Sequence, residues 1–217
     1  MKNEKRKTRD MRLVFASNNA HKLEEVRRIM PEGVEVVSLH EIGFVQEIEE
    51  TGETLEENSR IKAETVAAFI GERLKVRGER IDGVFADDTG LEIHALGGQP
   101  GVYSARWAGS PEANRAKALR ELADKEDRSA RFRTVITLIM KPTPALPKGK
   151  EFVQVEGEVR GYITDQEDGK GGFGYDPVFV PEGYDKTFGE LPAEVKNKIS
   201  HRARAMQELV KILQKGL

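Results

Sequence analysis

The chain has 217 residues, of which 38% are hydrophobic and 33% are charged, and its formal net charge is -2. A chain of this length buries most of the apolar surface that it exposes when unfolded, which predicts a globular protein, and its near-neutral charge argues against non-specific nucleic-acid binding. The absence of cysteine excludes disulfides, zinc–thiolate sites and thiol catalysis.

The first ten residues are basic and lack the apolar core of a secretory signal, so we expect residues 1–10 to form a flexible tail. No stretch of about 18 apolar residues occurs, which predicts a protein without a membrane span and a cytoplasmic location. We expect residues 11–217 to form a single domain of two lobes that share a core.

Strands and helices alternate in the first part of the chain. Apolar runs and helical spacings predict a strand at residues 11–16, a helix at 20–30, a strand at 34–39, a long helix at 54–76 and a strand at 83–86. Alternation of this kind is typical of α/β proteins.

The second part contains more extended segments. The same signals predict a helix at 111–123, a strong strand at 131–140, a proline-rich loop at 141–150, an antiparallel strand pair within 151–164 and an amphipathic helix at 201–214. Together, the two parts predict an α/β fold with a mixed sheet covered by helices.

Residues 16–22 (ASNNAHK) lie where the first strand leads into the first helix. Free backbone amides at a helix start attract anions, Ser17 and Asn19 can donate hydrogen bonds, and Lys22 adds a positive charge. This predicts a phosphate-binding turn without the Walker pattern of P-loop enzymes. The alternative is that Ser17 or Asn19 simply caps the helix.

Carboxylates are dense in residues 47–62, before and inside a predicted helix start. Acidic residues in a first helical turn commonly complement the helix dipole, but this explanation does not cover Glu49 and Glu50, which precede the helix. Mg²⁺ binds a few carboxylate oxygens and leaves room for substrate phosphates, so the segment predicts metal ligands. Asn58 and Lys62 are four residues apart on one helix face, where both could meet a polyanion.

Two adjacent carboxylates, Asp87 and Asp88, stand at the predicted end of the strand at 83–86. Like charges this close resist ionising together unless a cation or solvent intervenes. If the strand instead runs over residues 84–88, successive side chains point to opposite faces, so only one of the pair needs to face a ligand. Thr89 and Gly90 are expected to turn the chain, and the alternative is a solvated turn without a ligand.

The triplet at residues 88–90 (DTG) also occurs in aspartic proteases. Those enzymes need two aspartates sharing a proton across an all-β site. This chain has one such triplet and four predicted helices. The fold class therefore argues against a protease.

Glycine is concentrated in residues 169–177 (GKGGFGYDP). The spacing matches G-x-G-x-x-G, but no helix is predicted after it, so the segment fails as a dinucleotide-binding fingerprint. Phe173, followed by Asp176, instead suits a slot where a planar base stacks on an aromatic ring. The alternative is a tight turn whose Phe173 fills the core.

Polar residues cluster before and at the start of the last predicted helix, namely Lys196, Ser200, His201 and Arg202. They are positioned to receive an electron-rich group, although His201 could instead be a capping or surface residue. The histidines are isolated from one another in the sequence, so a histidine metal site is not expected.

The blocks at residues 16–22, 49–58, 85–109, 171–179 and 200–205 occur together and in one order. They resemble the inosine/xanthosine triphosphate pyrophosphatase family, and the similarity runs from residue 13 to residue 213. The resemblance implies an elongated mixed sheet with helices on both faces and two lobes around a central cleft. It also implies Mg²⁺-dependent hydrolysis of ITP, dITP and XTP to the monophosphate and pyrophosphate. This reaction removes damaged nucleotides from the precursor pool. The resemblance further implies a homodimer without nucleic-acid or membrane partners.

Residue roles follow from the resemblance by position. Asp88 would be the general base and a metal ligand, and Glu49 would hold the metal, with Glu50 as the alternative because the acidic run aligns ambiguously by one residue. The phosphate-binding residues would be Ser17, Asn18, Asn19, Lys22 and Lys62. The substrate-binding residues would be Thr89, Phe173, Gly174, Tyr175, Asp176, Lys196, Ser200, His201 and Arg202. The sequence departs from the family at Asn18, where glycine is common, and at Ser59, where alanine is frequent.

Selectivity is expected at the purine 6-position. Lys196 or Arg202 can donate to a 6-keto oxygen, whereas the 6-amino group of ATP would leave these donors unpaired. A nucleotide-binding regulatory module without turnover is the alternative function. A general base such as Asp88 favours the enzyme, because binding alone does not need one.

Overall fold

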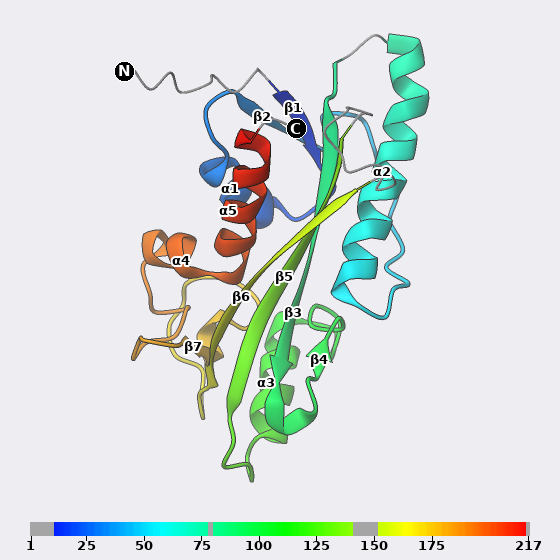
Figure 1. Ribbon diagram of the computed structural model, residues 1–217. Helices are drawn as coiled ribbons and strands as arrows, with labels where there is room; N and C mark the ends of the chain where they lie inside the picture. Colours follow the sequence, from blue (N-terminus) through cyan, green and yellow to red (C-terminus); the bar gives the residue numbers. More distant parts are fainter. Residues whose placement is uncertain (1–10, 78–79, 141–151, 216–217) are drawn as a thin grey trace, which may run out of the picture.

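The structure is a computed structural model that describes residues 11–77, 80–140 and 152–215 (Figure 1). The strands are β1 (Met11–Phe15), β2 (Val34–Ser38), β3 (Gly83–Ile93), β4 (Pro100–Gly101), β5 (Ser129–Met140), β6 (Val153–Ile163) and β7 (Phe179–Pro181). The helices are α1 (Ala20–Ile29), α2 (Leu55–Arg77), α3 (Pro111–Glu121), α4 (Ala193–Ile199) and α5 (His201–Gln214), with short 3₁₀ helices η1 (His94–Leu96) and η2 (Asp176–Val178).

One mixed sheet joins the strands of the described ranges in the order β2-β1-β3-β5-β6-β7, with β4 paired to β3. β1 runs parallel to β2 and β3, whereas the remaining pairs are antiparallel. The long strands β3, β5 and β6 run diagonally through the molecule (Figure 1). The predicted α/β fold with a mixed, elongated sheet is therefore confirmed.

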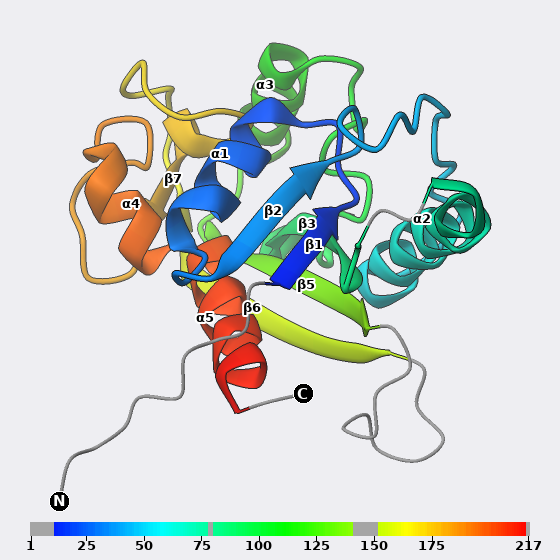
Figure 2. The same ribbon diagram turned by 90° about the horizontal axis from the view of Figure 1, so that it is seen from above.

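Helices cover both faces of the sheet, with α2 on one face and α1 and α5 on the other (Figure 2). Side chains alternate along the strands: Phe15 and Phe85 stack with ring centroids 4.9 Å apart on the α1 and α5 face, while Val14 and Val84 pack against α2. A third apolar cluster, which includes Phe132, joins the other end of the long strands to α3 and β7.

The predicted end of the third strand at residue 86 is wrong, because β3 continues for a further seven residues. Asp87 and Asp88 lie inside the strand, and Thr89 and Gly90 do not turn the chain. β5 pairs with every residue of β3, from Gly83 with Met140 to Ile93 with Ala130, and this partner from a distant part of the chain keeps β3 extended. A Cβ atom at Gly90 would lie 2.7 Å from the carbonyl oxygen of Gly101, so the glycine serves the close approach of β4.

The two aspartates nevertheless lie beyond a strand end, that of β1. β1 stops at Phe15, which pairs in parallel with Phe85. Asp87 and Asp88 extend past this carboxyl end. Ligands of open α/β sheets bind in this position.

The predicted strand pair within 151–164 is also wrong, because the segment forms the single strand β6. Its glycines do not mark turns but allow close packing. A Cβ atom at Gly157 would lie 2.3 Å from the backbone nitrogen of Ala205 on α5, and one at Gly161 would lie 2.1 Å from the carbonyl oxygen of Val180 on β7. The predicted loop at 141–150 and the N-terminal tail lie outside the described residues.

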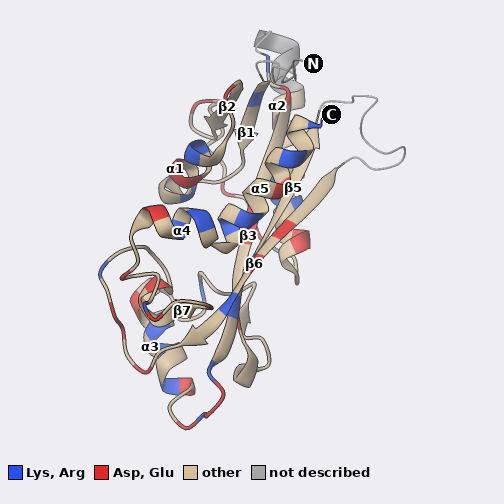
Figure 3. Cartoon of the chain, turned by 60° about the vertical axis from the view of Figure 1, so that its left-hand side comes forward, with Lys and Arg blue, Asp and Glu red and all other residues tan. Residues whose placement is uncertain are grey.

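The last helix begins at His201 as predicted, but α4 precedes it as a separate helix that carries Lys196. Figure 3 shows lysine and arginine interspersed with aspartate and glutamate over the helices and strands, in line with the small net charge. In the part of the chain that the structure describes, no helix is long and apolar enough to cross a membrane.

Candidate active site

A cavity of about 690 Å³ lies at the carboxyl end of β1 and contacts the start of α1, α2, β3, the segment before η2, α4 and α5. Most of the predicted site residues line it: Ser17, Asn18, Asn19, Lys22, Glu50, Lys62, Asp88, Thr89, Phe173, Gly174, Tyr175, Asp176, Lys196, His201 and Arg202. Glu49 has an exposed side chain and Ser200 is buried, and neither lines the cavity. The fold thus gathers residues from segments up to 185 positions apart, from Ser17 to Arg202.

Asp88 and Glu50 are joined by one lysine. The Nζ atom of Lys62 donates to Asp88 Oδ1 at 2.8 Å and to Glu50 Oε1 at 3.0 Å. The other Glu50 oxygen accepts from Arg106 Nη1 at 3.0 Å. Of the two neighbouring glutamates, the structure therefore places Glu50 beside Asp88.

Asp88 keeps one oxygen unused. Its Oδ2 atom is buried and has no hydrogen-bond partner among the described residues. Burial raises the pKa of the Asp88 carboxyl above its ordinary value, although Lys62 opposes this effect. A buried acceptor that no donor satisfies is unfavourable unless water, a cation or a substrate proton meets it, so this oxygen is suited to chemistry.

Asp87 has the opposite surroundings. It accepts from Lys22 Nζ at 3.0 Å and from Arg202 Nε at 3.1 Å, on the face of the sheet that α1 and α5 cover. Burial alone would raise the pKa of the Asp87 carboxyl, but Lys22, Arg202 and Lys62 outweigh it and hold the pKa well below its usual range. Asp87 is thus a fixed anion that neutralises two cations of the site.

The start of α1 is capped by its own side chains, and the same residues line the cavity. Asn19 is the N-cap, and its Oδ1 atom accepts from the backbone nitrogen of Lys22 at 3.1 Å. Ser17 Oγ accepts from the backbone nitrogen of Asn19 at 3.3 Å. Ser17, Asn18 and Asn19 also line the cavity, so the capping hydrogen bonds order a turn of the cavity wall.

Phe173 lies in the cavity wall and not in a core cluster, so the alternative that it fills the core is not what the structure shows. Lys196 Nζ lies 4.4 Å from the centroid of its ring and Arg202 Cζ 5.7 Å. Asp176 accepts from Phe173 N at 2.7 Å and from Lys196 Nζ at 2.6 Å. Tyr175 instead packs in the third cluster and donates to a backbone carbonyl, that of residue 104, at 2.9 Å.

His201 is a buried, neutral residue of the cavity wall. Its ring stacks on Phe132 with centroids 4.7 Å apart. Burial, with the charges of Arg202 and Lys196, lowers the pKa of His201 well below its ordinary value. Its Nδ1 atom has no hydrogen-bond partner among the described residues, so it can meet a ligand. The neighbouring Ser200 is the N-cap of α5 and accepts from the backbone nitrogen of Ala203 at 3.2 Å, which gives it a structural role.

The chain is similar to known proteins of one family. The model of the Ham1 family matches residues 13–212. The chain belongs to the Ham1 family. The resemblance found in the sequence is thereby confirmed.

Ham1 relatives with a curated name are similar over nearly their whole length. A dITP/XTP pyrophosphatase of Flavobacterium johnsoniae is 44% identical, with 94% of this chain and 98% of the relative covered. One of Bacillus subtilis is 46% identical, with 93% and 96% covered. The solved structure of the Staphylococcus aureus Ham1 protein is 38% identical with a TM-score of 0.80, and 95% of this chain and all of that chain are covered.

The carboxylates of this Ham1 cavity fit a divalent cation only in combination with a substrate. In the described ranges, no group of three or more histidine, aspartate or glutamate side chains could hold a metal ion by itself. Asp88 and Glu50 are both 3.0 Å or less from Lys62 Nζ, and Asp88 Oδ2 is unpartnered. Mg²⁺ commonly binds through one or two carboxylates plus substrate phosphates, and this donor set meets that requirement.

Sequence reasoning missed several residues that support the site. Glu25 on α1 accepts from Arg202 Nη1 at 2.5 Å and lies 3.6 Å from Lys196 Nζ, so it ties α1 to the start of α5 and to α4. Arg115 on α3 donates to the carbonyl oxygen of Gly174 at 2.8 Å. Glu25 follows Lys22 by one helical turn, and this spacing was an available signal; nothing near Arg115 in the sequence points to Gly174.

Asn58 differs from its expected role beside Lys62. It is fully buried, and its Oδ1 atom accepts from the backbone nitrogen of Gly52 at 2.8 Å. It does not line the cavity. Asn58 therefore fixes the turn that follows Glu50, while Lys62, one helical turn later, reaches the site.

Proposed function

We propose that this chain hydrolyses the non-standard purine nucleoside triphosphates ITP, dITP and XTP to the monophosphate and pyrophosphate, and so removes damaged nucleotides from the precursor pool. Relatives named dITP/XTP pyrophosphatase, at 44% and 46% identity over more than nine-tenths of this chain, support the substrate class. The geometry of the cavity supports the reaction.

The observation that carries the proposal is the free oxygen of Asp88. Its Oδ1 atom is held by Lys62, and its Oδ2 atom is buried without a partner at the cavity wall. A carboxylate fixed in this way accepts a proton at Oδ2 from a water molecule that attacks the α-phosphorus, with pyrophosphate as the leaving group.

Mg²⁺ is the cofactor in this proposal, with Asp88 and Glu50 as its protein ligands. Glu49, the first choice by the family resemblance, has an exposed side chain outside the cavity wall, so Glu50 is the better-supported ligand. When bound, the ion neutralises phosphate charge and lowers the pKa of water. Lys62 donates to both carboxylates with two of its three N–H groups, and the third can donate to a phosphate oxygen.

The phosphates are bound by the start of α1 in this proposal. Ser17, Asn18 and Lys22 line the cavity, where the N-terminus of the helix and the charge of Lys22 favour an anion. Asp87 holds Lys22 in place at 3.0 Å. The positive end of the helix and the fixed lysine stabilise the charge that develops on the leaving pyrophosphate.

In this proposal the base is recognised by residues of the segment before η2, of α4 and of α5. Lys196 and Arg202 are oriented by the carboxylates of Asp176 and Glu25, and both lie near the ring of Phe173. Their donors suit a 6-keto oxygen and would be left unpaired by the 6-amino group of ATP. Homodimer assembly and a cytoplasmic location also remain part of the proposal, on the strength of the family resemblance.

The experiment is product analysis of ITP, dITP, XTP, ATP and GTP after incubation with the protein and Mg²⁺. Ion-exchange separation is expected to show inosine monophosphate and pyrophosphate from ITP, with far slower turnover of ATP. Formation of a diphosphate with orthophosphate would contradict the reaction. Tight binding of ITP without turnover would identify a regulatory module instead.

A further inference from the structure

The ring of His21 contacts the ring on which the base is proposed to stack. His21 and Phe173 are stacked with centroids 5.9 Å apart and planes inclined by 13°. Both side chains line the cavity. They come from unconnected segments, because His21 lies in the first turn of α1 and Phe173 precedes η2. The cavity therefore has an aromatic side chain on each of two opposing segments.

Local structure does not require a histidine at this position. The side chain is exposed, it is not the N-cap of α1, and no hydrogen bond to its ring occurs among the described residues. Its neighbours in the turn serve other purposes, since Asn19 caps the helix and Lys22 pairs with Asp87. The described contact of the imidazole is thus with the ring of Phe173 across the cavity.

We propose that His21 and Phe173 are the two walls of the purine slot, so that a bound base stacks between the imidazole and the phenyl ring. The inference rests on the proposed function. Histidine and phenylalanine are both side chains on which nucleobases stack. Because the two rings are already nearly parallel, a flat base can enter between them when they move apart. The free imidazole of His21 can make that adjustment without breaking a hydrogen bond.

The two walls of the slot differ in the charged groups beside them. Lys196 and Arg202 lie over the Phe173 ring and supply donors for the edge of the base. His21 brings no charged partner and is expected to add stacking area without reading the edge of the base. Its contribution is therefore expected to be the same for every purine, whereas Lys196 and Arg202 distinguish a 6-keto oxygen from a 6-amino group.

The test compares His21→Ala, His21→Phe and the wild-type protein, with turnover of ITP and XTP as the first readout. Loss of one stacking wall is expected to raise KM for both nucleotides by roughly tenfold at nearly constant kcat. His21→Phe keeps an aromatic wall and is expected to stay within about twofold of the wild type. Calorimetric binding of inosine monophosphate without Mg²⁺ should weaken in His21→Ala by a similar factor, which gives a readout independent of turnover.

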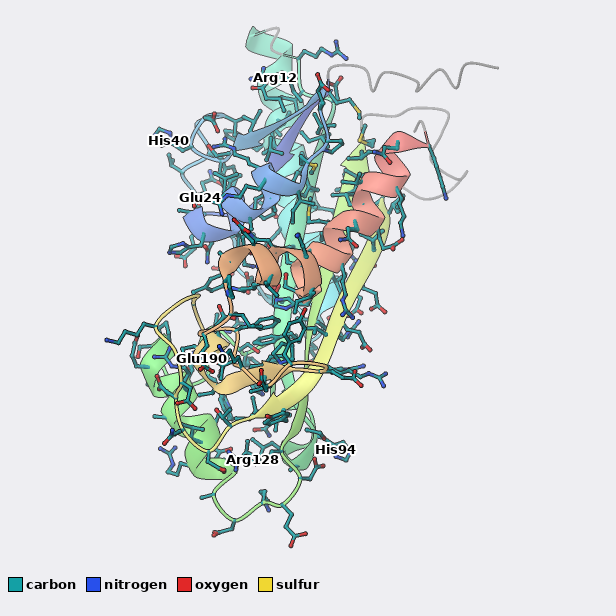
Figure 4. The ribbon with its side chains drawn as sticks, turned by 90° about the vertical axis from the view of Figure 1, so that its left-hand side faces the viewer. Arg12, Glu24, His40, His94, Arg128 and Glu190 are labelled. Carbon is teal, nitrogen blue, oxygen red and sulfur yellow. The ribbon has the colours of Figure 1, made fainter. Side chains whose placement is uncertain are left out.

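Two controls separate base stacking from damage to the phosphate turn. Inhibition by pyrophosphate, which has no base, should be unchanged in His21→Ala. The variant His40→Ala replaces an exposed histidine that lies at the periphery of the molecule (Figure 4) and outside the cavity, and it should behave as the wild type.

Each other outcome overturns the inference. An unchanged KM in His21→Ala would show that the imidazole does not contact the base. A lowered KM would show that His21 covers the Phe173 ring only in the absence of nucleotide and competes with the base. Weaker inhibition by pyrophosphate would assign His21 to the phosphate turn. Absence of ITP turnover in the wild type would instead contradict the proposed function itself.

Discussion

Asp87 and Asp88 are adjacent in β3, but their side chains lie on opposite faces of the sheet and have different ion-pair partners. On the face covered by α1 and α5, Asp87 is closed in by two cations, and its pKa is held well below the usual range. On the face covered by α2, Asp88 shares a single lysine with Glu50 and keeps one oxygen free, and its pKa is raised. A fully paired carboxylate stabilises structure, whereas a partly paired one at a cavity can take part in chemistry.

The largest effect is expected from Asp88→Asn, which keeps the shape of the side chain and removes its basicity. We expect kcat for ITP to fall by about a thousandfold, because general-base catalysis is typically worth that order of magnitude. Inosine monophosphate should still bind. Urea unfolding should show no loss of stability, since the substitution removes a carboxylate that burial disfavours. Retention of more than a tenth of wild-type kcat would contradict the role of Asp88.

Asp87→Asn is expected to lower the free energy of unfolding. Removal of this anion leaves Lys22 without its carboxylate partner and leaves Arg202 with Glu25 alone. Breaking a buried ion pair typically costs about 3–5 kcal/mol. The free energy of unfolding in urea measures the loss. Asp165→Asn is the matched control, because Asp165 pairs with Arg128 at the surface with a 91% exposed side chain and should change stability by less than about 1 kcal/mol. Equal effects of the two substitutions would contradict the comparison.

A smaller effect is expected from the pH dependence of stability through His201, on the Asp87 face. Its pKa in the folded state lies well below 6.5, so below about pH 6.5 the unfolded chain binds more protons than the folded protein does. Stability should therefore fall as the pH is lowered, by about 1.4 kcal/mol per pH unit from this group alone.

The measurement for His201 is urea unfolding between pH 7 and pH 5. Other titrating groups are common to the wild type and to His201→Gln, so the difference between them isolates the histidine. The wild type should lose stability more steeply than the variant over this range. Parallel curves would show that His201 accepts a proton in the folded state.

Much of the site could be predicted from the sequence because it depends on local signals. The turn at Ser17 and Asn19 follows from a strand that ends before an amphipathic helix, and the structure adds that Asn19 caps the helix while lining the cavity. Opposite orientation of Asp87 and Asp88 follows from strand geometry alone. These features depend only on neighbouring residues, so they can be predicted without knowledge of the fold.

The predictions of strand bounds were wrong where contacts with segments distant in the sequence determine the local structure. β3 continues through Gly90 because β5 pairs along its whole length and β4 approaches closely. β6 passes through Gly157 as one strand because α5 packs against that glycine. In both places the sequence contains glycine, which is typical of turns. In the structure, each glycine instead allows another segment to pack closely against the strand.

The sequence by itself determined the classes of residue in the cavity, the alternation of strands and helices, and the family, because these depend on composition, spacing and order along the chain. Only the tertiary structure decided that Glu50 and not Glu49 joins Lys62 and Asp88, that Glu25 orients Arg202, and that His21 faces Phe173. Such pairings depend on how separate segments pack, and a shift of one residue along an irregular segment turns a side chain from the cavity to solvent.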